Sequence, residues 1–251
     1  MKKGLMINRL LSQFPKPHYL EIGVQAGASF VTARAEQRWA VDPKFKATLK
    51  EQIKKSESVW PFFRREWFFE MTSDEFFVRE AKRLNRKKID LAFVDGLHTY
   101  EQSYRDVLNC LLYLRAGGVI LLHDCHPTSE SMAYPAPSYG DAAAAKLAGW
   151  TKEWCGDVWK TIVYLRSCHL QLNVFVLDCD YGVGVITRGE PESVLPYSPE
   201  DIRQMDYRDL ADNRQRFLNL KQPEYLETFI KKRSSVRIRE RRCRSGSSIW
   251  T

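Results

Sequence analysis

The chain has 251 residues, of which 44% are hydrophobic, enough for one substantial core without a second domain. No run approaches the ~20 apolar residues that a membrane-spanning helix needs, and Asn8 and Arg9 interrupt the apolar start before it reaches signal-peptide length. This excludes a membrane protein, and we expect a soluble, cytoplasmic one. The net charge of +8 is concentrated in residues 231–251, which carry +7, so it does not indicate a basic surface on the rest of the chain.

Apolar periodicity predicts alternating strands and helices along the chain. Strands are expected at residues 19–23, 39–43, 67–71, 89–94 and 117–124, followed by an antiparallel hairpin of residues 172–178 and 183–188. Helices are expected from Ser29 to about Arg38 and over residues 72–85, 99–112 and 141–147, with a further helical region from Ser198. Residues 158–165 fit a helix or a strand, and the Pro-, Ser- and Tyr-rich residues 125–140 predict a loop that lies over the strand ends. This order is typical of an α/β protein with a largely parallel sheet.

Two of the predicted strands end in Asp and His. Asp95 and His98 follow the apolar run 89–94, and His123 and Asp124 follow the run 119–122. The helix predicted between them makes a right-handed crossover, with Gly117 and Gly118 expected to close that helix. Ligands of open α/β sheets bind outside the carboxyl ends of the strands, so we expect these four side chains to converge on one site.

The first predicted strand runs into a glycine turn, with Glu21, Gly23 and Gly27 in the order Glu-x-Gly-x-x-x-Gly. Glycines let the backbone approach a ligand, and a following helix N-terminus supplies free N–H donors. The acid beside the turn suits a ligand with a cationic ammonium group. Asp42, about twenty residues on at the end of the second strand, is placed to accept hydrogen bonds from a ribose diol. Together these residues predict a nucleotide-type binding site.

These motifs resemble those of class I S-adenosylmethionine-dependent methyltransferases, over roughly residues 17–190. Residues 21–27 match the first motif of that family, Asp42 its ribose-binding acid, and the turn containing Ser73 and Asp74 the one that flanks the adenine. The segments 94–98 and 117–124 resemble the branch that contains macrocin-type O-methyltransferases and cephalosporin-hydroxylase-like proteins. The resemblance implies a Rossmann-like, doubly wound, mostly parallel seven-stranded sheet with an antiparallel terminal hairpin strand. It also implies S-adenosylmethionine as cofactor, bound by Glu21, Gly23, Gly27, Asp42, Ser73 and Asp74.

In metal-dependent members of that branch, acids after the fourth and fifth strands hold a divalent cation. The resemblance therefore implies a metal site at Asp95, His123 and Asp124, for Mg, Mn or Fe. Because His123 stands where an acid is usual, an imidazole ligand favours Mn, Fe or Zn over Mg. His98 matches the position of a proposed general base, and an imidazole titrates near neutrality. The resemblance thus makes His98 and Asp95 the catalytic residues.

Plainer interpretations remain open for these residues. Asp95 could cap the following helix or contact the cofactor, and His98 could form a hydrogen bond where the helix begins. Two histidines and one carboxylate could also form the iron facial triad of a non-heme hydroxylase. A third hypothesis is a non-catalytic cofactor-binding module that the basic tail delivers to nucleic acid or another anionic partner.

We predict one methyltransferase domain over residues 1–230 and a basic, disordered tail over residues 231–251. The preferred function is O-methylation of a small-molecule or saccharide hydroxyl, with no membrane partner and no nucleic acid except through the tail. The acceptor and the question of a homo-oligomer stay open.

Overall fold

The structure is a computed structural model that describes residues 1–49, 51, 53 and 65–233. Its strands are β1 (His18–Ile22), β2 (Gln37–Asp42), β3 (Arg65–Glu70), β4 (Ile89–Val94), β5 (Leu114–Leu122), β6 (Leu172–Leu177), β7 (Val183–Arg188) and β8 (Leu220–Lys221). Its labelled helices are α1 (Lys3–Leu11), the short 3₁₀ helix η1 (Phe30–Thr32), α3 (Ser73–Arg79), α4 (Ala81–Lys87), α5 (Tyr100–Tyr113), α6 (Tyr139–Ala144), α7 (Trp159–Cys168), α8 (Pro199–Gln204) and α9 (Tyr207–Leu218). None of the helices described is long and apolar enough to cross a membrane.

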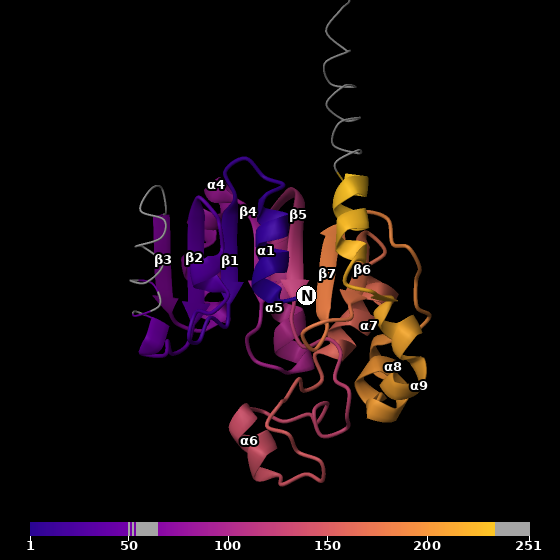
Figure 1. Ribbon diagram of the computed structural model, residues 1–251. Helices are drawn as coiled ribbons and strands as arrows, with labels where there is room; N and C mark the ends of the chain where they lie inside the picture. The colour runs from indigo at the N-terminus through magenta and orange to yellow at the C-terminus, as the bar shows by residue number, and fades with distance from the viewer. Residues whose placement is uncertain (50, 52, 54–64, 234–251) are drawn as a thin grey trace, which may run out of the picture.

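One sheet of eight strands organises the fold, in the order β3-β2-β1-β4-β5-β7-β6-β8 (Figure 1). Strands β3, β2, β1, β4 and β5 pair in parallel, and β7 pairs antiparallel to both β5 and β6. The Rossmann-like architecture and the hairpin are therefore confirmed. The sheet has eight strands where seven were expected, because the two-residue β8 pairs with β6 and is too short to leave an alternating pattern.

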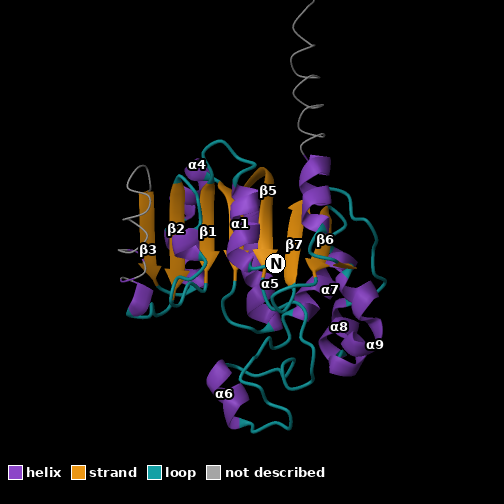
Figure 2. Cartoon of the chain, viewed as in Figure 1, coloured by secondary structure: helices purple, strands orange, loops and turns teal. Residues whose placement is uncertain are grey.

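Side chains alternate between two cores on opposite faces of the sheet. Ile22, Val41, Val94 and Leu122 belong to the core that α3, α4, α5, α7 and α9 cover. The core on the other face includes Tyr19, Phe93 and Leu121, together with α1 and the helical residues 225–233. Figure 2 shows helices on both faces. Strands β1, β2 and β4 are thus buried on both sides, as their uninterrupted apolar runs predict, whereas the edge strand β3 is partly exposed.

The prediction of a helix from Ser29 to about Arg38 is wrong. Only η1 forms there, and Gln37 and Arg38 already belong to β2. The buried Arg38 guanidinium donates to the carbonyls of Phe30, Val31 and Ala33 at 2.7, 3.1 and 3.2 Å. A side chain therefore binds carbonyls that a longer helix would have paired with its own N–H groups.

Two other helix boundaries differ from expectation. The capping box of Thr72 and Glu75 starts α3 as predicted, but Glu80 ends α3 and begins α4, so residues 72–85 form two short helices. Helix α5 ends at Tyr113, before Gly117 and Gly118, which lie inside β5. The β4–β5 register shifts near this point. A Cβ on Gly118 would lie 2.7 Å from the Leu114 side chain, which explains the glycine there.

The carboxyl ends of the parallel strands meet at one edge of the sheet, where a long insertion carries α6 away from the sheet (Figure 1). The insertion includes the expected loop and leads into α7, which settles the ambiguous residues 158–165 as helix. At the other end of the chain, helical residues 225–233 bury Leu226, Phe229 and Ile230. The helix thus includes the first residues of the predicted tail, and residues 234–251 lie outside the described part.

Candidate active site

A cavity of about 410 Å³ opens at the carboxyl ends of β1, β2 and β4, beside α3 and α5. Four of the six predicted cofactor residues line it: Gly23, Asp42, Ser73 and Asp74. The other lining residues are Ile22, Gln25, Val41, Pro43, Thr72, Asp95, Gly96, Leu97, Gln102 and Asp106. The predicted Glu21 and Gly27 are not among them.

Gly23 brings the first turn against the backbone that carries Asp95. Its φ is +83°, a conformation that favours glycine, and an added Cβ would lie 1.9 Å from the carbonyl oxygen of Asp95. Its N–H donates to the Val41 carbonyl at 2.9 Å. Three strand ends are therefore packed at a distance that excludes any side chain at position 23.

Gly27 supports the same turn through close packing. Its φ is +84°, its N–H donates to the Val24 carbonyl at 2.8 Å, and a Cβ there would lie 2.2 Å from Leu49 Cδ1. Gly27 thus supports the turn through packing, whereas the sequence predicted a direct role in the cofactor site.

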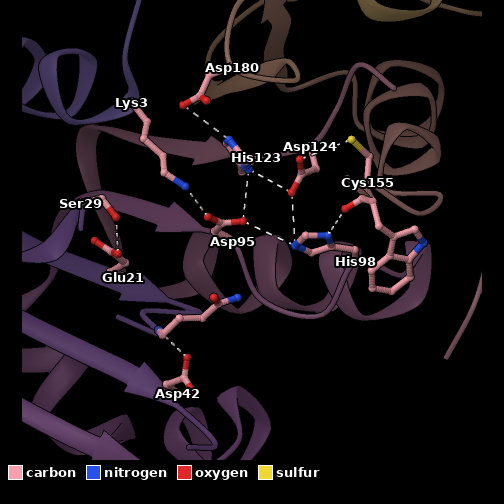
Figure 3. A network of polar contacts seen from close by, with 12 residues as sticks. Lys3, Glu21, Ser29, Asp42, Asp95, His98, His123, Asp124, Cys155 and Asp180 are labelled. Atoms are coloured by element: carbon pink, nitrogen blue, oxygen red, sulfur yellow. Dashed lines mark hydrogen bonds and ion pairs between the residues drawn. The ribbon is translucent and has the colours of Figure 1, made fainter. Parts of the chain in front are cut away.

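Asp42 fixes the rim of the cavity where β2 ends. Its Oδ2 accepts the Gln25 backbone N–H at 2.8 Å, and its Oδ1 accepts the Lys44 N–H at 2.8 Å. Figure 3 shows Asp42, with a dashed line that marks one of these hydrogen bonds. Each carboxylate oxygen has further acceptor capacity, so the side chain can bind a diol while it holds the turn.

Ser73 and Asp74 lie at the start of α3, facing α5. The Gln102 amide donates to Ser73 Oγ at 3.2 Å and to Asp106 Oδ1 at 3.1 Å, and it lies 3.5 Å from Asp74 Oδ1. Thr99 caps α5, but the Gln102 side chain points across to α3. Gln102 and the buried Asp106, whose pKa burial raises to about 6, are cavity residues that the pattern missed.

Glu21 faces away from the cavity because strand side chains alternate, which puts it with Tyr19 on the opposite side from Ile22. It is 1% exposed, and it accepts hydrogen bonds from Tyr19 Oη at 2.5 Å and Ser29 Oγ at 2.6 Å. These contacts tie β1 to the end of the glycine turn. The predicted direct contact with a cofactor ammonium is not supported by this placement.

Burial raises the pKa of Glu21 from 4.5 to about 7. Between these values the folded protein keeps a proton that the unfolded chain releases, so the free energy of unfolding falls as pH rises, by about 3 kcal/mol. We expect the melting temperature of the wild type to fall between pH 5 and pH 8. In Glu21→Gln, which lacks the titrating carboxyl group, this fall should be smaller by roughly 6–10 °C. Calorimetry checks this, with the exposed Glu190→Gln as control. Parallel pH curves for wild type and Glu21→Gln would contradict the assignment.

The second group of predicted residues forms a compact polar centre next to the cavity (Figure 3). The Asp95 N–H donates to the Ile22 carbonyl and the His123 N–H to the Val94 carbonyl, both at 2.9 Å, so the ladder continues past the strand ends. His123 Nδ1 lies 3.2 Å from Asp95 Oδ1 and 2.9 Å from Asp124 Oδ2. The expected convergence of the two strand ends is therefore present.

Asp124 reaches the centre through an unusual backbone conformation. In a continuing strand it would point to the face opposite His123. Its φ of +60° breaks the strand and brings both side chains together. Its other oxygen, Oδ1, accepts from Cys155 Sγ at 3.4 Å. Asp adopts this conformation more readily than most residue types.

His98 completes the centre from the start of α5. Its Nε2 lies 3.5 Å from Asp95 Oδ1 and 3.2 Å from Asp124 Oδ2, the two oxygens that His123 also faces. Its Nδ1 is 2.8 Å from the Trp154 carbonyl and its ring stacks on the Trp154 ring, with centroids 5.2 Å apart. An Nδ1–H that donates to this carbonyl leaves Nε2 free to accept a proton or bind a cation.

Opposite charges set the ionisation of this centre. Burial disfavours the ionised form of Asp95 and by itself would raise its pKa. The interactions with His123, His98 and Lys3 have the larger effect and hold the pKa of Asp95 well below its usual range. Burial likewise opposes the charge on both histidines, and the carboxylates of Asp95 and Asp124 outweigh it and raise the pKa of His98 and of His123 above 6.5. The site thus holds the Asp95 carboxylate ionised, in contact with two imidazoles.

Two residues that contact the centre, Lys3 and Asp180, were not predicted from the sequence. Lys3, on α1, places Nζ 2.9 Å from Asp95 Oδ2. Asp180, in the β6–β7 turn, has Oδ2 3.7 Å from His123 Nε2. Both reach the site over long sequence separations, which a pattern of local spacing does not reveal.

Residues 20–125 match a family model described as a methyltransferase domain. Among solved structures, the chain is similar to cofactor-bound Rv0187 from MTB, with 16% identity and a TM-score of 0.50 over 74% of this chain and 79% of that one. It is also similar to the Podospora anserina methyltransferase PaMTH1 with bound SAH, with 18% identity and a TM-score of 0.48 over 75% of this chain and 78% of that one. At 16% identity the likeness to Rv0187 shows the fold alone. No curated protein sequence matches the chain significantly.

The matched segment contains the glycine turn, Asp42 and the Asp95–Asp124 centre, and it includes the adjacent parallel strands that build the cavity. Residues 20–125 therefore match a methyltransferase domain, set in a Rossmann-like sheet.

Proposed function

We propose that this enzyme methylates a hydroxyl oxygen on a small molecule or a sugar. One observation carries the proposal: Asp95 both lines the cofactor cavity and belongs to the centre of carboxylates and imidazoles. A hydroxyl bound at that centre would lie beside the cofactor. S-adenosylmethionine, when bound, supplies an electrophilic methyl group on a sulfonium sulfur.

The residues of the chain would divide the work between binding and proton transfer. Asp42 would accept hydrogen bonds from the ribose hydroxyls, and the turn at Gly23 would let the backbone approach the ligand. His98 Nε2 would take the proton from the acceptor hydroxyl, because the contact of Nδ1 with the Trp154 carbonyl fixes the ring. The Trp154 ring beside it would shield this step from water.

The centre also has donors that suit a divalent cation. Ligand atoms of Asp95, His98 and Asp124 all lie within 4.8 Å of one another, and His123 Nδ1 contacts the same two carboxylates. We propose Asp95, Asp124 and His123 as ligands, with His98 as base. A mixed oxygen and nitrogen set favours Mn, Fe or Zn over Mg. Such a cation would acidify and orient the hydroxyl.

The test combines binding, turnover and metal content for the full chain. We expect calorimetry to show S-adenosylmethionine binding, and labelled methyl groups to reach hydroxyl acceptors in a panel of sugars and phenols. Treatment with EDTA should lower turnover, and Mn²⁺ should restore it. Asp124→Asn should lose bound metal, whereas Asp178→Asn, a control at an exposed carboxylate that contacts His126, should keep it.

Different results would overturn separate parts of the proposal. Turnover that EDTA leaves unchanged in metal-free enzyme would remove the cation and leave His98 as a plain base. Iron-dependent and oxygen-dependent modification of acceptors, without methyl transfer, would favour the hydroxylase alternative, because two histidines and a carboxylate do converge here. Methylation of nitrogen acceptors alone would contradict the hydroxyl assignment.

A further inference from the structure

Lys3 contacts the active centre from a part of the chain outside the segment that matches the methyltransferase domain. Its Nζ lies 2.9 Å from Asp95 Oδ2, while Asp95 Oδ1 faces His123 and His98 at 3.2 and 3.5 Å. The two oxygens of one carboxylate are therefore divided, one toward the lysine and one toward the imidazoles. Figure 3 shows Lys3 and the imidazoles on different sides of Asp95.

Helix α1 delivers this lysine from a firmly packed position. Asn8 Nδ2 donates to the Thr32 carbonyl at 2.9 Å, and Asn8 Oδ1 accepts the Arg34 N–H at 2.7 Å. The buried face of α1 consists of Met6, Ile7, Leu10 and Leu11. The helix is thus anchored to the segment that follows the cofactor turn, and the lysine side chain, 31% exposed, is directed inward.

We propose that Lys3 is a positioning residue: its ammonium holds Asp95 with Oδ1 toward the imidazoles, and its fixed positive charge opposes the binding of a divalent cation at the centre. This inference rests on the cation site of the proposed function. It assigns to the N-terminal helix control over how tightly the centre holds metal.

The Lys3 ammonium would weaken cation binding by Asp95 in two ways. An ammonium that occupies Asp95 Oδ2 disfavours bidentate binding of a cation by that carboxylate, so only Oδ1 is available as a ligand. Two positive charges that share one carboxylate repel each other, and this repulsion is strong where burial limits screening. Because Lys3 is partly exposed, water weakens the effect without removing it. Loss of the lysine charge should therefore tighten cation binding.

The experiment measures Mn²⁺ affinity of the full chain by calorimetry, without acceptor. We expect Lys3→Met to bind Mn²⁺ at least about tenfold more tightly than wild type, as two nearby charges in a partly buried site imply. Lys3→Arg keeps the charge and should stay near wild type. Lys2→Met removes the same charge from the adjacent, exposed position and should also stay near wild type. Circular dichroism confirms that each variant is folded.

Each outcome decides the inference. Tighter binding by Lys3→Met alone supports it, including the case in which only this variant binds Mn²⁺. Equal or weaker binding overturns it and leaves the proposed metal site intact. Absence of Mn²⁺ binding in all four proteins overturns both the metal site and the inference, while methyl transfer to hydroxyls is tested separately by the labelled-methyl assay.

Discussion

Replacement of Asp42 by Ala should weaken S-adenosylmethionine binding by roughly 10- to 150-fold, because charge-assisted hydrogen bonds are each worth ~1.5–3 kcal/mol. Asp42 lines the cavity, and its two oxygens also hold the backbone N–H groups of Gln25 and Lys44. Its loss would remove the acceptor for a ribose diol and loosen the rim at the same time. Calorimetric titration with S-adenosylhomocysteine measures the change.

Two further variants separate these contributions. Asp42→Asn keeps one side-chain oxygen as an acceptor, so it should lose less affinity than Asp42→Ala. Glu70 is the register partner of Asp42 on β3, is exposed and does not line the cavity. Glu70→Ala should therefore bind like wild type. Wild-type affinity in Asp42→Ala would remove this side chain from the cofactor site.

The sequence was sufficient for the succession of strands β1 to β7 along the chain and for the meeting of Asp95 and His123. Both follow from apolar runs that end in polar residues, since parallel strands place their carboxyl ends at one edge. The same motifs predict a methyltransferase, and residues 20–125 match a methyltransferase domain.

The errors have physical causes that local patterns do not contain. The helix after Ser29 fails because the buried Arg38 guanidinium takes the carbonyls of η1. Glu21 does not line the cavity, because its carboxylate is bound by Tyr19 and Ser29 on the other face of the sheet. Gln102 was not predicted as a cavity residue, because only the packing of α5 beside α3 brings its amide to Ser73.

The active centre depends most on contacts between distant segments. Lys3 and Asp180 come from outside the matched segment. The position of the Asp124 side chain depends on a positive φ, which the sequence did not predict. Trp154 and Cys155 reach the centre from the insertion, whose fit against His98 is close: a Cβ on Gly156 would lie 1.8 Å from the His98 carbonyl oxygen. Sequence spacing predicted which polar side chains meet at the centre, and the roles assigned to them stay predictions.

That division can be tested at the two histidines, where we expect His98→Ala to lower turnover by ~10²-fold or more while it keeps bound metal, as loss of a general base implies. The His98 side chain is 19% exposed and His123 only 7%, so His98 is the imidazole that an acceptor can reach.

His123→Ala should instead lose bound metal, because His123 Nδ1 lies nearer to both shared carboxylate oxygens than His98 Nε2 does. Metal content by mass spectrometry and initial rates of methyl transfer separate the two variants, with His169→Ala as a control because His169 contacts Tyr104, outside the centre. If His98→Ala loses the metal and His123→Ala keeps it, the two roles are reversed, and His98, Asp95 and Asp124 become the ligand set. If His98→Ala turns over like wild type with its metal bound, neither role belongs to His98, and proton removal must fall to another group or to water.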